Sequence, residues 1–575
     1  MTGRVELRGQ GASGGIAIGP AYVFRRTVQA LRRVVGPEGV AAEIDRLRRA
    51  VEVARAQLAA LREKALREAG TDQAAIFEAH DLMLQDPELV GRAELVILEG
   101  ECNAEWALQQ AGEKVASSLE SVPDEYLRAR AADVRDVVSR VVCILEGRFG
   151  HPLGELPEPV VVVSEELMPS DTAQTDRDKV LGFVMERGSS TSHAAILART
   201  MGIVAVVGVT GVLEAVSSGD TVVADGNTGV VVVGPSPEEL QEWEVKKQGW
   251  YERRKRLQAL VSLRAVTKDG HRVELAANVG SLGDLESALA WGAEGVGLFR
   301  TEFLFMDRGS PPSEDEQFEV YRQAAQTMSG RPVIIRTLDV GGDKPIPWLG
   351  RLEEANPFLG LRGIRLCLER EEVFLTQLRA LLRARVYGDV WVMFPMVADV
   401  GEVHAARRLL EKAREELAAA GVPHGELPVG IMVEVPSAAL LARHLLQEVD
   451  FVSVGTNDLT QYTLAADRSN ARVARLADAL HPAVLRLIAE VAEAGWRAGK
   501  WVGVCGDLAG DPLAAPLLVG LGVNELSMAP SLLSEVKEAV RSVSVTEAQE
   551  LARRALACRS AGEVRELLTH NRQLK

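Results

Sequence analysis

One histidine in this chain stands in a setting that could carry a phosphoryl group. Residues 188–199 read GSSTSHAAILAR, so His193 follows Thr191 and Ser192 and precedes an apolar run with helical spacing. A serine or threonine before such a run predicts a helix N-cap. The free N–H groups and partial positive charge of a helix N-terminus favour bound phosphate and disfavour imidazolium. His193 is therefore expected to be neutral and nucleophilic, although a helix cap with an incidental histidine explains the local pattern equally well.

Chemically active residues also follow short apolar segments in the C-terminal half of the chain. From about residue 270 to 540, seven or eight apolar strands alternate with helical segments, which predicts a (β/α)8 barrel. The carboxyl ends of the strands in such a barrel converge on one face, where active sites lie. Helix caps or rim salt bridges would explain one or two polar strand ends, but not a whole set. The set comprises Asn278, Arg300, Glu302, Arg336, Asp339, Glu434, Asn457, Asp458 and Cys505.

The residue types at this face indicate the chemistry. Arg300, Arg336 and Arg468 could bind phosphate and carboxylate groups through bidentate hydrogen bonds. Glu434 and Asp458 are hard oxygen ligands at neighbouring strand ends. Two carboxylates together with substrate oxygens are a usual way for a protein to hold Mg²⁺. The expected substrate is therefore small, anionic and phosphorylated.

Cys505 follows the last clear strand, in the segment VGVCGDLAG, and two interpretations of it stay open. A thiol at the active face could donate a proton to a carbon atom of the substrate. A buried cysteine that acts only as a small apolar side chain is the commoner case.

Bulk properties exclude several classes of protein. The 575 residues predict about three or four domains. The net charge of −16 without a long basic tract argues against nucleic acid as the main partner. No apolar run approaches the roughly 20 residues of a membrane span, and MTGRVELRGQ lacks the apolar centre of a signal peptide. Five scattered cysteines fit a reducing cytoplasm.

The chain divides by composition along its length. Residues 1–24 are glycine-rich and then strand-like, whereas residues 38–148 carry Ala, Leu, Arg and Glu at helical spacing. Short apolar strands fill residues 159–234, and a hairpin turn is expected at residues 227–229. The charged stretch 237–261 has the pattern of a linker helix.

Several segments match the motifs of one known family. They are IFEAHDLMLQDPEL (76–89), YLRARAADVRD (126–136), GAEGVGLFRTEFLFMDR (292–308), IIRTLDVGGDK (334–344), NPFLGLRGIR (356–365), GIMVEVPSA (430–438), SVGTNDLTQYTLAADR (453–468) and VCGDLAG (504–510). In this order they make essentially the whole chain resemble enzyme I of the bacterial phosphotransferase system, a phosphoenolpyruvate–protein phosphotransferase.

The resemblance implies a multidomain α/β fold. A swivelling α/β phosphohistidine domain would carry an inserted helical bundle, and a TIM-type (β/α)8 barrel would follow. The expected domains are 1–24 and 149–236 for the phosphohistidine domain, 25–148 for the helical domain that docks the carrier protein HPr, 237–261 for the linker helix, and 262–575 for the barrel that binds phosphoenolpyruvate and dimerises. The protein would be a cytoplasmic homodimer that does not insert into the membrane.

The resemblance also implies roles for matching residues. His193 would be phosphorylated at Nε2, and Cys505 would protonate the enolate that remains, giving pyruvate. Glu434 and Asp458 would hold Mg²⁺. The residues implied to bind phosphoenolpyruvate are Arg300, Arg336, Arg362, Asn457, Asp458 and Arg468.

This sequence departs from the family pattern around His193. The family's Gly-Gly-basic-Thr-Ser-His is Gly188-Ser189-Ser190-Thr191-Ser192-His193, and its Ser-Pro-Gly is Ser13-Gly14-Gly15. The family's Leu-Thr-Pro-Ser is LMPS at residues 167–170, so Met168 replaces a threonine that resembles a hydrogen-bond partner of the active histidine. These changes cluster around His193, where they would affect the rate and the acceptor of transfer, while the barrel motifs are intact.

Three alternatives share part of this pattern. A dikinase or synthase would use the same barrel and swivelling domain, but no glycine-rich nucleotide-binding region is present. A paralogue could phosphorylate a different, regulatory carrier. A non-catalytic protein could report the phosphoenolpyruvate level, although the intact Cys505 and metal ligands argue against that.

The separation of His193 from the barrel leads to a further hypothesis. The two must meet for phosphoryl transfer, so a swivel about the 237–261 helix is expected to bring His193 to the barrel and then to the carrier. A disulfide that locks this linker should remove one half-reaction.

Overall fold

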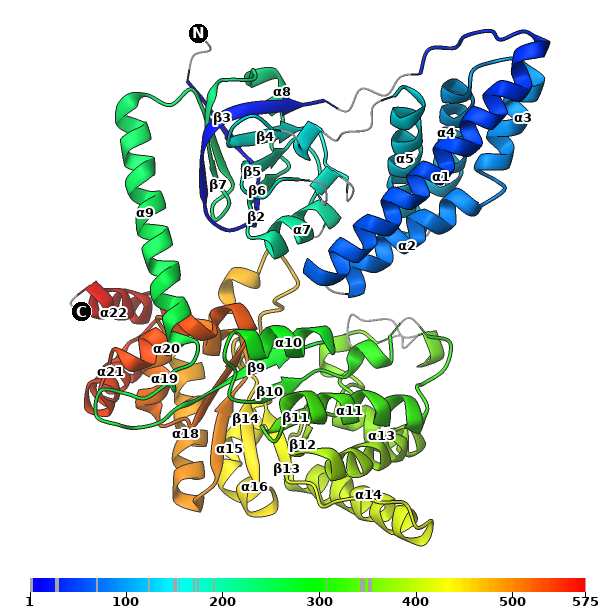
Figure 1. Cartoon of the computed structure of the whole chain (residues 1–575). Helices are drawn as coiled ribbons and strands as arrows, with labels where there is room; N and C mark the ends of the chain where they lie inside the picture. The colour runs from blue at the N-terminus through cyan, green and yellow to red at the C-terminus, as the bar shows by residue number, and fades with distance from the viewer. Residues whose placement is uncertain are drawn as a thin grey trace. The chain divides into compact units, whose positions relative to one another are not determined.

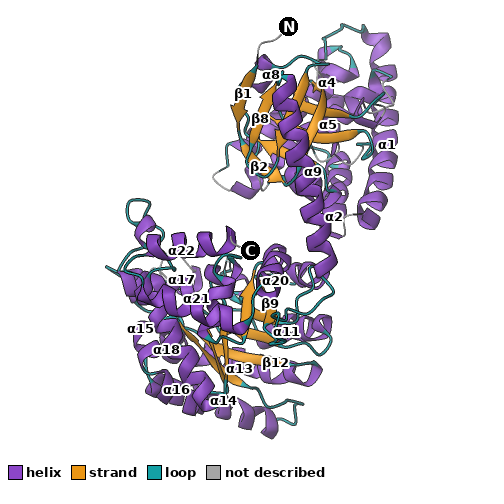
Figure 2. Cartoon of the chain, turned by 90° about the vertical axis from the view of Figure 1, so that its left-hand side faces the viewer, coloured by secondary structure: helices purple, strands orange, loops and turns teal. Residues whose placement is uncertain are grey.

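The structure is a computed structural model of the chain, which separates into two compact units, Met1–Arg254 and Lys255–Lys575. In both units the strands lie together and helices cover them (Figures 1 and 2). The structure describes residues 4–25, 30–68, 71–122, 125–147, 152–154, 156–168, 171–172, 175–189, 192–306, 308–341, 347–349 and 354–573.

An eight-stranded mixed sheet forms the framework of the first unit, in the order β1-β8-β7-β3-β4-β5-β6-β2. Neighbours from β3 to β6 are parallel, and the remaining pairs are antiparallel. Strands such as VVVVS in β4 are buried throughout, as expected where both faces of a sheet are covered. The bounds are β1 Val5–Arg8, β2 Gln10–Ser13, β3 Ile16–Phe24, β4 Val160–Ser164, β5 Val180–Met185, β6 Val204–Val207, β7 Thr221–Asp225 and β8 Val230–Val233.

The hairpin predicted from the sequence is confirmed between β7 and β8. Asp225 closes β7, and its carboxylate accepts hydrogen bonds from the Asn227 N–H at 2.9 Å and the Thr228 hydroxyl at 2.7 Å. Gly229 takes a left-handed φ of 76°, which glycine adopts without a steric penalty. The turn therefore follows from local side-chain chemistry.

The helix predicted to begin at His193 is also present. Helix α7 spans His193–Met201, and a short α8 (Val212–Ala215) follows β6. Ser192 is the N-cap of α7, and its Oγ accepts a hydrogen bond from the Ala195 N–H at 3.4 Å. This cap fixes the start of the helix and so places the His193 backbone in its first turn.

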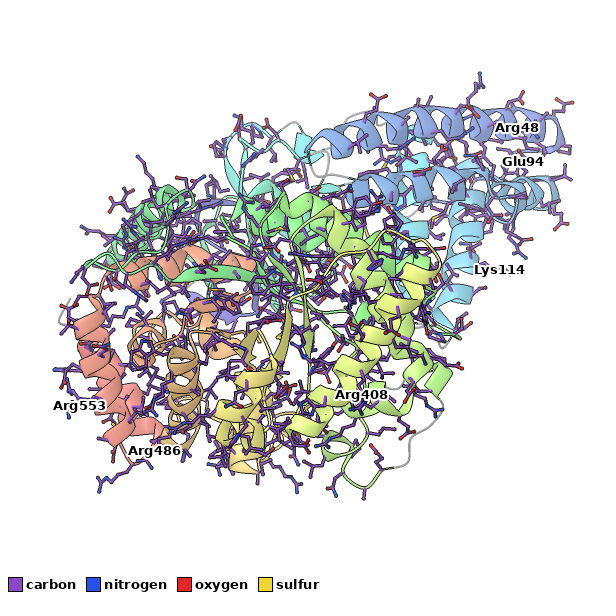
Figure 3. The ribbon with its side chains drawn as sticks, turned by 90° about the horizontal axis from the view of Figure 1, so that it is seen from below. Arg48, Glu94, Lys114, Arg408, Arg486 and Arg553 are labelled. Carbon is purple, nitrogen blue, oxygen red and sulfur yellow. The ribbon has the colours of Figure 1, made fainter. Side chains whose placement is uncertain are left out.

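Five helices form a bundle between β3 and β4: α1 Pro37–Glu68, α2 Thr71–Gln85, α3 Val90–Gly100, α4 Ala104–Glu120 and α5 Glu125–Leu145 (Figure 1). One face of α1 is polar and exposed, and Arg48 on this face pairs with Glu94 of α3 at 2.7 Å (Figure 3). A stripe at helical spacing on α1 packs into the core of the bundle. The stripe is Leu47, Val51, Ala54, Leu58 and Leu61.

Helix α9 (Pro237–Leu260) contains the boundary between the two units. None of its residues is buried, as its mixed charges suggest. It occupies the stretch in which the linker helix is predicted, and the domain boundaries given above stay predictions.

The second unit is built on a closed barrel of eight parallel strands, which confirms the predicted fold class. The main core lies between the strands and the surrounding helices. The strands are β9 Glu274–Val279, β10 Val296–Phe299, β11 Val333–Arg336, β12 Val390–Phe394, β13 Val429–Val433, β14 Phe451–Val454, β15 Trp501–Val504 and β16 Glu525–Met528. The helices are α10 Gly283–Ala290, α11 Glu314–Met328, α12 Ile364–Glu369, α13 Glu371–Ala384, α14 Val400–Ala419, α15 Pro436–Leu440, α16 Ala442–Glu448, α17 Thr456–Leu464, α18 Pro482–Ala498, α19 Ala515–Leu521, α20 Leu533–Arg541, α21 Val545–Ala557 and α22 Ala561–Gln573.

Aromatic side chains fill the amino-terminal end of the barrel. Trp391, Phe451 and Trp501 point inward, with ring centroids 5.0 to 5.8 Å apart. This packed layer closes one end of the barrel and leaves the other end for polar side chains. Among the described residues, no helix is long and apolar enough to cross a membrane.

Candidate active site

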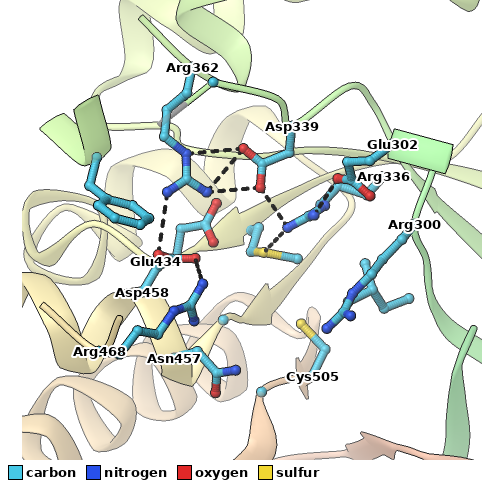
Figure 4. Close-up of a pocket in the computed structure, with 16 residues that line it drawn as sticks. Arg300, Glu302, Arg336, Asp339, Arg362, Glu434, Asn457, Asp458, Arg468 and Cys505 are labelled. Atoms are coloured by element: carbon cyan, nitrogen blue, oxygen red, sulfur yellow. Dashed lines mark hydrogen bonds and ion pairs between the residues drawn. The ribbon is translucent and has the colours of Figure 1, made fainter. Parts of the chain in front are cut away.

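A cavity of about 160 Å³ lies at the carboxyl ends of the barrel strands (Figure 4). It contains every barrel residue to which the sequence assigns a site role. The lining residues are Leu298, Arg300, Glu302, Arg336, Asp339, Gly341, Phe358, Arg362, Met432, Glu434, Gly455, Asn457, Asp458, Arg468, Cys505 and Gly506. Asn278, which the strand-end pattern also singled out, is not among them.

The barrel strands place most of these side chains directly. Arg336 is the last residue of β11, and Arg300, Glu434 and Cys505 each follow the last residue of a strand. Asn457 and Asp458 lie in the first turn of α17, just after β14. Parallel strands therefore bring residues far apart in sequence to a single rim.

Close contact between two strand ends depends on a glycine. A Cβ atom at Gly506 would lie only 1.9 Å from Thr456 Oγ1, so any larger residue would force the ends of β14 and β15 apart. Their closeness keeps Cys505 beside the turn that carries Asp458. The glycine of VCGDLAG thus has a packing role in the site.

Arg336 is buried between two carboxylates. Its Nη2 donates to Glu302 Oε1 at 2.5 Å, and its Nη1 lies 2.9 Å from Asp339 Oδ2. Burial alone would lower the pKa of Arg336, but the nearby carboxylates outweigh burial and raise it. The guanidinium is therefore a fixed positive charge at the cavity wall.

Arg362 is held in the same way from a loop before α12. Its Nη2 lies 3.1 Å and 3.0 Å from the two oxygens of Asp339, and its Nη1 lies 3.4 Å from Asp458 Oδ1. The Tyr462 hydroxyl, 3.2 Å from Nη1, donates in turn to the Phe358 carbonyl at 2.6 Å. Burial opposes the charge, but these carboxylates raise the pKa of Arg362.

Arg300, Arg468 and Asn457 lie at the more open part of the cavity. Both arginines are exposed, and Arg468 Nη2 lies 3.7 Å from Asp458 Oδ2. The Asn457 Oδ1 accepts the Asp507 N–H at 2.9 Å, which fixes the orientation of the amide. The exposed guanidinium groups, together with the buried ones, would offer several hydrogen-bond donors to an anion in the cavity.

Glu434 is a buried carboxylate beside other carboxylates. Its Oε1 accepts the Met396 N–H at 2.7 Å. Burial, followed by the like charges of Asp458 and Asp339, raises the pKa of Glu434 to about 8. A divalent cation would relieve this repulsion, so the donor set of Glu434 and Asp458 fits Mg²⁺ chemically. Within the described part of the chain, no cluster of three or more His, Cys, Asp or Glu side chains is placed to hold a metal ion.

Cys505 is a neutral thiol at the floor of the cavity. It is 2% exposed, and burial raises its pKa to about 12, although the nearby Ser453 hydroxyl acts in the opposite direction. The thiol donates to the Val454 carbonyl at 3.7 Å. The Asn278 amide donates to the Cys505 carbonyl at 2.9 Å and accepts from the Ser527 hydroxyl at 2.6 Å. Asn278 therefore supports the strand end that carries the thiol, which stays protonated at neutral pH.

His193 belongs to the first unit, whereas the cavity belongs to the second. The structure places its backbone at the start of α7, and its side chain lies outside the described atoms, as do residues 190 and 191. Met168, the substituted position, lines a separate cavity of about 260 Å³ with residues of α4 and α5. Its backbone N–H donates to Asp171 Oδ2 at 2.9 Å.

The sequence pattern assigns no role to two residues that line the cavity, or to a tyrosine that supports Arg362. The sequence marks Glu302 and Asp339 only as strand ends, whereas in the structure they are the counter-charges that hold Arg336 and Arg362. Tyr462 was not singled out, although it lies one helical turn after Asp458 in α17. That spacing of four residues was the available signal.

Protein-family profiles match three parts of the chain. The profile for the PEP-binding domain of PEP-utilising enzymes matches residues 254–545, the one for their N-terminal region matches 8–130, and the one for their mobile domain matches 156–229. The first of these covers the barrel strands and the whole cavity.

Curated relatives are similar over nearly the full length. A phosphoenolpyruvate-protein phosphotransferase of Geobacillus stearothermophilus is 46% identical over 97% of this chain and 96% of its own. Proteins of the same name from Staphylococcus carnosus and Bacillus subtilis are 44% and 45% identical, over 98% and 97% of this chain and 98% of each relative. A solved NMR structure of an Enzyme I protein is 39% identical, covers 43% of this chain and 99% of its own, and has a TM-score of 0.37.

Proposed function

This chain belongs to the phosphoenolpyruvate–protein phosphotransferase family, and we propose that it transfers the phosphoryl group of phosphoenolpyruvate to His193 and then to a histidine of the carrier HPr. Pyruvate is the other product. The observation that carries the proposal is the single cavity in which four arginines, four carboxylates and a neutral thiol converge. Such a site recognises a small anion with both phosphate and carboxylate groups.

The arginines bind and orient the substrate. Arg336 and Arg362 are held by carboxylates before any ligand arrives, so little reorganisation is needed when the anion binds. The exposed Arg300 and Arg468, with Asn457, close around the ligand from the open side. Phosphoryl transfer depends mainly on such positioning and charge neutralisation.

Mg²⁺ is the metal proposed for Glu434 and Asp458, whose chemistry fits it. When bound, the ion supplies positive charge against the negative charge that develops on phosphoryl and enolate oxygens. Glu434 is oriented for this role by the hydrogen bond from Met396.

Protonation of carbon is assigned to Cys505. When the phosphorus–oxygen bond breaks and the phosphorus–nitrogen bond to His193 forms, pyruvate enolate remains in the cavity. The Cys505 thiol gives its proton to the terminal enolate carbon, which leaves a thiolate and pyruvate. A thiol whose burial keeps it protonated at neutral pH suits a proton donor.

Family membership also implies a domain swivel, a docking site for HPr and a cytoplasmic homodimer. His193 and the cavity lie in different units, so the reaction requires these units to come together, and α9 is the segment about which they would swivel. The helical bundle would dock HPr. The protein would act as a cytoplasmic homodimer, and its five free cysteines suit that reducing compartment.

Mass mapping after incubation with labelled phosphoenolpyruvate and Mg²⁺ tests the function. We expect acid-labile label on His193 that passes to added HPr, no label in His193→Ala, and normal label in His444→Ala, which changes an exposed histidine of α16. Label on His193 that HPr does not accept would point to a different carrier. Absence of label despite phosphoenolpyruvate binding would reject the enzyme and favour a sensor.

A further inference from the structure

A glutamate is buried inside the barrel below the cavity. Glu525, the first residue of β16, is 1% exposed, and neither of its carboxyl oxygens has a hydrogen-bond partner among the residues that the structure describes. Burial, followed by the charge of Glu274, raises the pKa of Glu525 well above its usual range. The side chain is therefore a neutral acid that holds a proton.

Two glycines make room for this carboxyl group. A Cβ atom at Gly297 would lie 2.0 Å from Glu525 Oε1, and one at Gly503 would lie 2.5 Å from Glu525 Oε2. Any other residue at either position would displace the acid. The Glu525 carboxyl group therefore occupies the space beside these glycines, and apolar side chains fill the rest of this layer of the barrel interior.

A serine lies near both this acid and the Cys505 thiol. The point where a Gly503 Cβ would lie is 3.3 Å from Ser453 Oγ as well as 2.5 Å from Glu525 Oε2. The buried Ser453 hydroxyl has no hydrogen bond of normal geometry in the described structure, yet it approaches Cys505 closely enough to lower the pKa of the thiol. Ser453 is thus near both groups, and neither its hydroxyl nor the Glu525 carboxyl is engaged by another described residue.

The strand register explains this alignment. Ser453 pairs with Gly503 across β14 and β15, and Gly503 pairs with Glu525 across β15 and β16. Cys505 lies two residues beyond Gly503 and so points to the same side of its strand. A polar column therefore runs along the barrel interior from Glu525 through Ser453 to Cys505.

The lower end of this column reaches a partly exposed carboxylate. Glu525 pairs in register with Glu274 of β9, whose side chain is 38% exposed and lies 3.5 Å from Arg272. Within the described residues of the neighbouring β10 and β15 there is no titratable side chain. Glu274 is therefore the group through which Glu525 can exchange protons with solvent.

We propose that Glu525 is a proton-relay residue that reloads Cys505 through Ser453 after each turnover. This inference rests on the proposed function, in which Cys505 protonates the enolate. When the unengaged Ser453 and Glu525 side chains rotate into hydrogen-bond contact, the Cys505 thiolate takes the Ser453 hydroxyl proton as Ser453 takes the Glu525 carboxyl proton, so Glu525 becomes a carboxylate. Glu525 then recovers a proton from solvent at Glu274, and no net charge remains in the barrel.

The relay has a physical reason. A thiolate formed at the cavity floor would be only 2% exposed, so its direct contact with solvent is restricted. A buried acid without hydrogen bonds also costs stability, and an apolar residue would pack there at lower cost. The position of Glu525 is thus better suited to proton transfer than to support of the fold.

Rapid-quench kinetics of the full-length protein test the relay. With phosphoenolpyruvate, Mg²⁺ and excess HPr, the first turnover uses the proton already on Cys505, whereas later turnovers need reloading. Glu525→Gln keeps the shape of the side chain but removes its acidic proton. We expect a first turnover equal to that of the unmodified protein and later turnovers slower by about tenfold or more.

Matched variants separate the relay from a structural role. Ser453→Ala is expected to reproduce the slow later turnovers, whereas Ser534→Ala, which removes a buried hydroxyl of α20 outside the barrel interior, should leave both phases unchanged. Equal rates in both phases for Glu525→Gln, or equal losses in both phases, would overturn the relay. Failure of the unmodified protein to label His193 would instead reject the proposed function itself.

Discussion

Arg362 and Asp339 form a two-oxygen ion pair at the mouth of the barrel, with Arg362 Nη2 3.1 Å and 3.0 Å from the carboxylate oxygens. The same carboxylate lies 2.9 Å from Arg336 Nη1. One buried aspartate thus fixes the spacing of two buried guanidinium groups before substrate binds. The anion site is therefore largely preformed by the chain's own charges.

Replacing Arg362 by lysine tests this preorganisation. An ammonium group cannot contact both oxygens of Asp339 and a ligand with the same planar fork, so the site loses charge-assisted hydrogen bonds worth about 1.5–3 kcal/mol. We expect the KM for phosphoenolpyruvate to rise by about 10- to 100-fold in steady-state assays. Arg408→Lys, on the exposed surface of α14, is the control and should leave KM unchanged (Figure 3). An unchanged KM in Arg362→Lys would show that the pair has no part in binding.

The barrel and most of its site could be predicted because both follow from local patterns in the sequence. Alternating apolar strands and helices predict the fold, and a polar residue directly after a strand predicts the active face, as for Arg336 and Glu434. The N-cap of α7 was likewise visible in the sequence, and the Ser192 hydrogen bond to Ala195 confirms it.

Other residues needed tertiary structure. Arg362 lies in a loop before α12, so only the family resemblance pointed to it, and the pairing partner of Asp339 depends on how that loop folds back over the barrel. Glu525 is an ionisable residue at the start of an otherwise apolar strand, which the local pattern treats as an exception. Its burial follows from barrel closure, which sequence periodicity does not encode.

The raised pKa of Cys505 predicts slow alkylation. At pH 8, a thiol with a pKa of about 12 has a thiolate fraction on the order of 10⁻⁴, and the thiolate is the reactive form. Peptide mapping after iodoacetamide treatment should therefore show Cys558, which is partly exposed, labelled long before Cys505. The Cys505 rate should rise about tenfold for each pH unit as long as the protein stays folded. Labelling of Cys505 as fast as Cys558 at pH 8 would mean that the thiol is not held protonated.

Glu434→Gln is expected to weaken Mg²⁺ binding. Glutamine keeps an oxygen that can accept the Met396 N–H but removes the negative charge that a divalent cation requires. Calorimetric titration with Mg²⁺ should show affinity lower by about tenfold or more. The matched change Glu415→Gln, on the exposed face of α14, should not alter the affinity. Equal affinities for both variants would remove Glu434 from the metal site.

Glu525→Gln is expected to make the barrel more stable at alkaline pH. The unfolded Glu525 carboxyl has a pKa of about 4.3 and loses its proton above that pH. In the folded protein the raised pKa keeps the proton on Glu525 to a higher pH. Its contribution to stability is therefore complete below about pH 4.3 and is lost as the pH rises toward the folded value, whereas glutamine does not titrate.

Calorimetry of the full-length protein should therefore show nearly the same Tm for Glu525→Gln and the unmodified protein at pH 4. At pH 8 the Tm of Glu525→Gln should be higher by a few degrees. Glu415→Gln, which changes an exposed glutamate, should show no such dependence on pH. A Tm difference between Glu525→Gln and the unmodified protein that stayed constant from pH 4 to pH 8 would show that Glu525 is ionised in the folded state. Because an ionised Glu525 could not return a proton to Cys505, the same result would also contradict the relay.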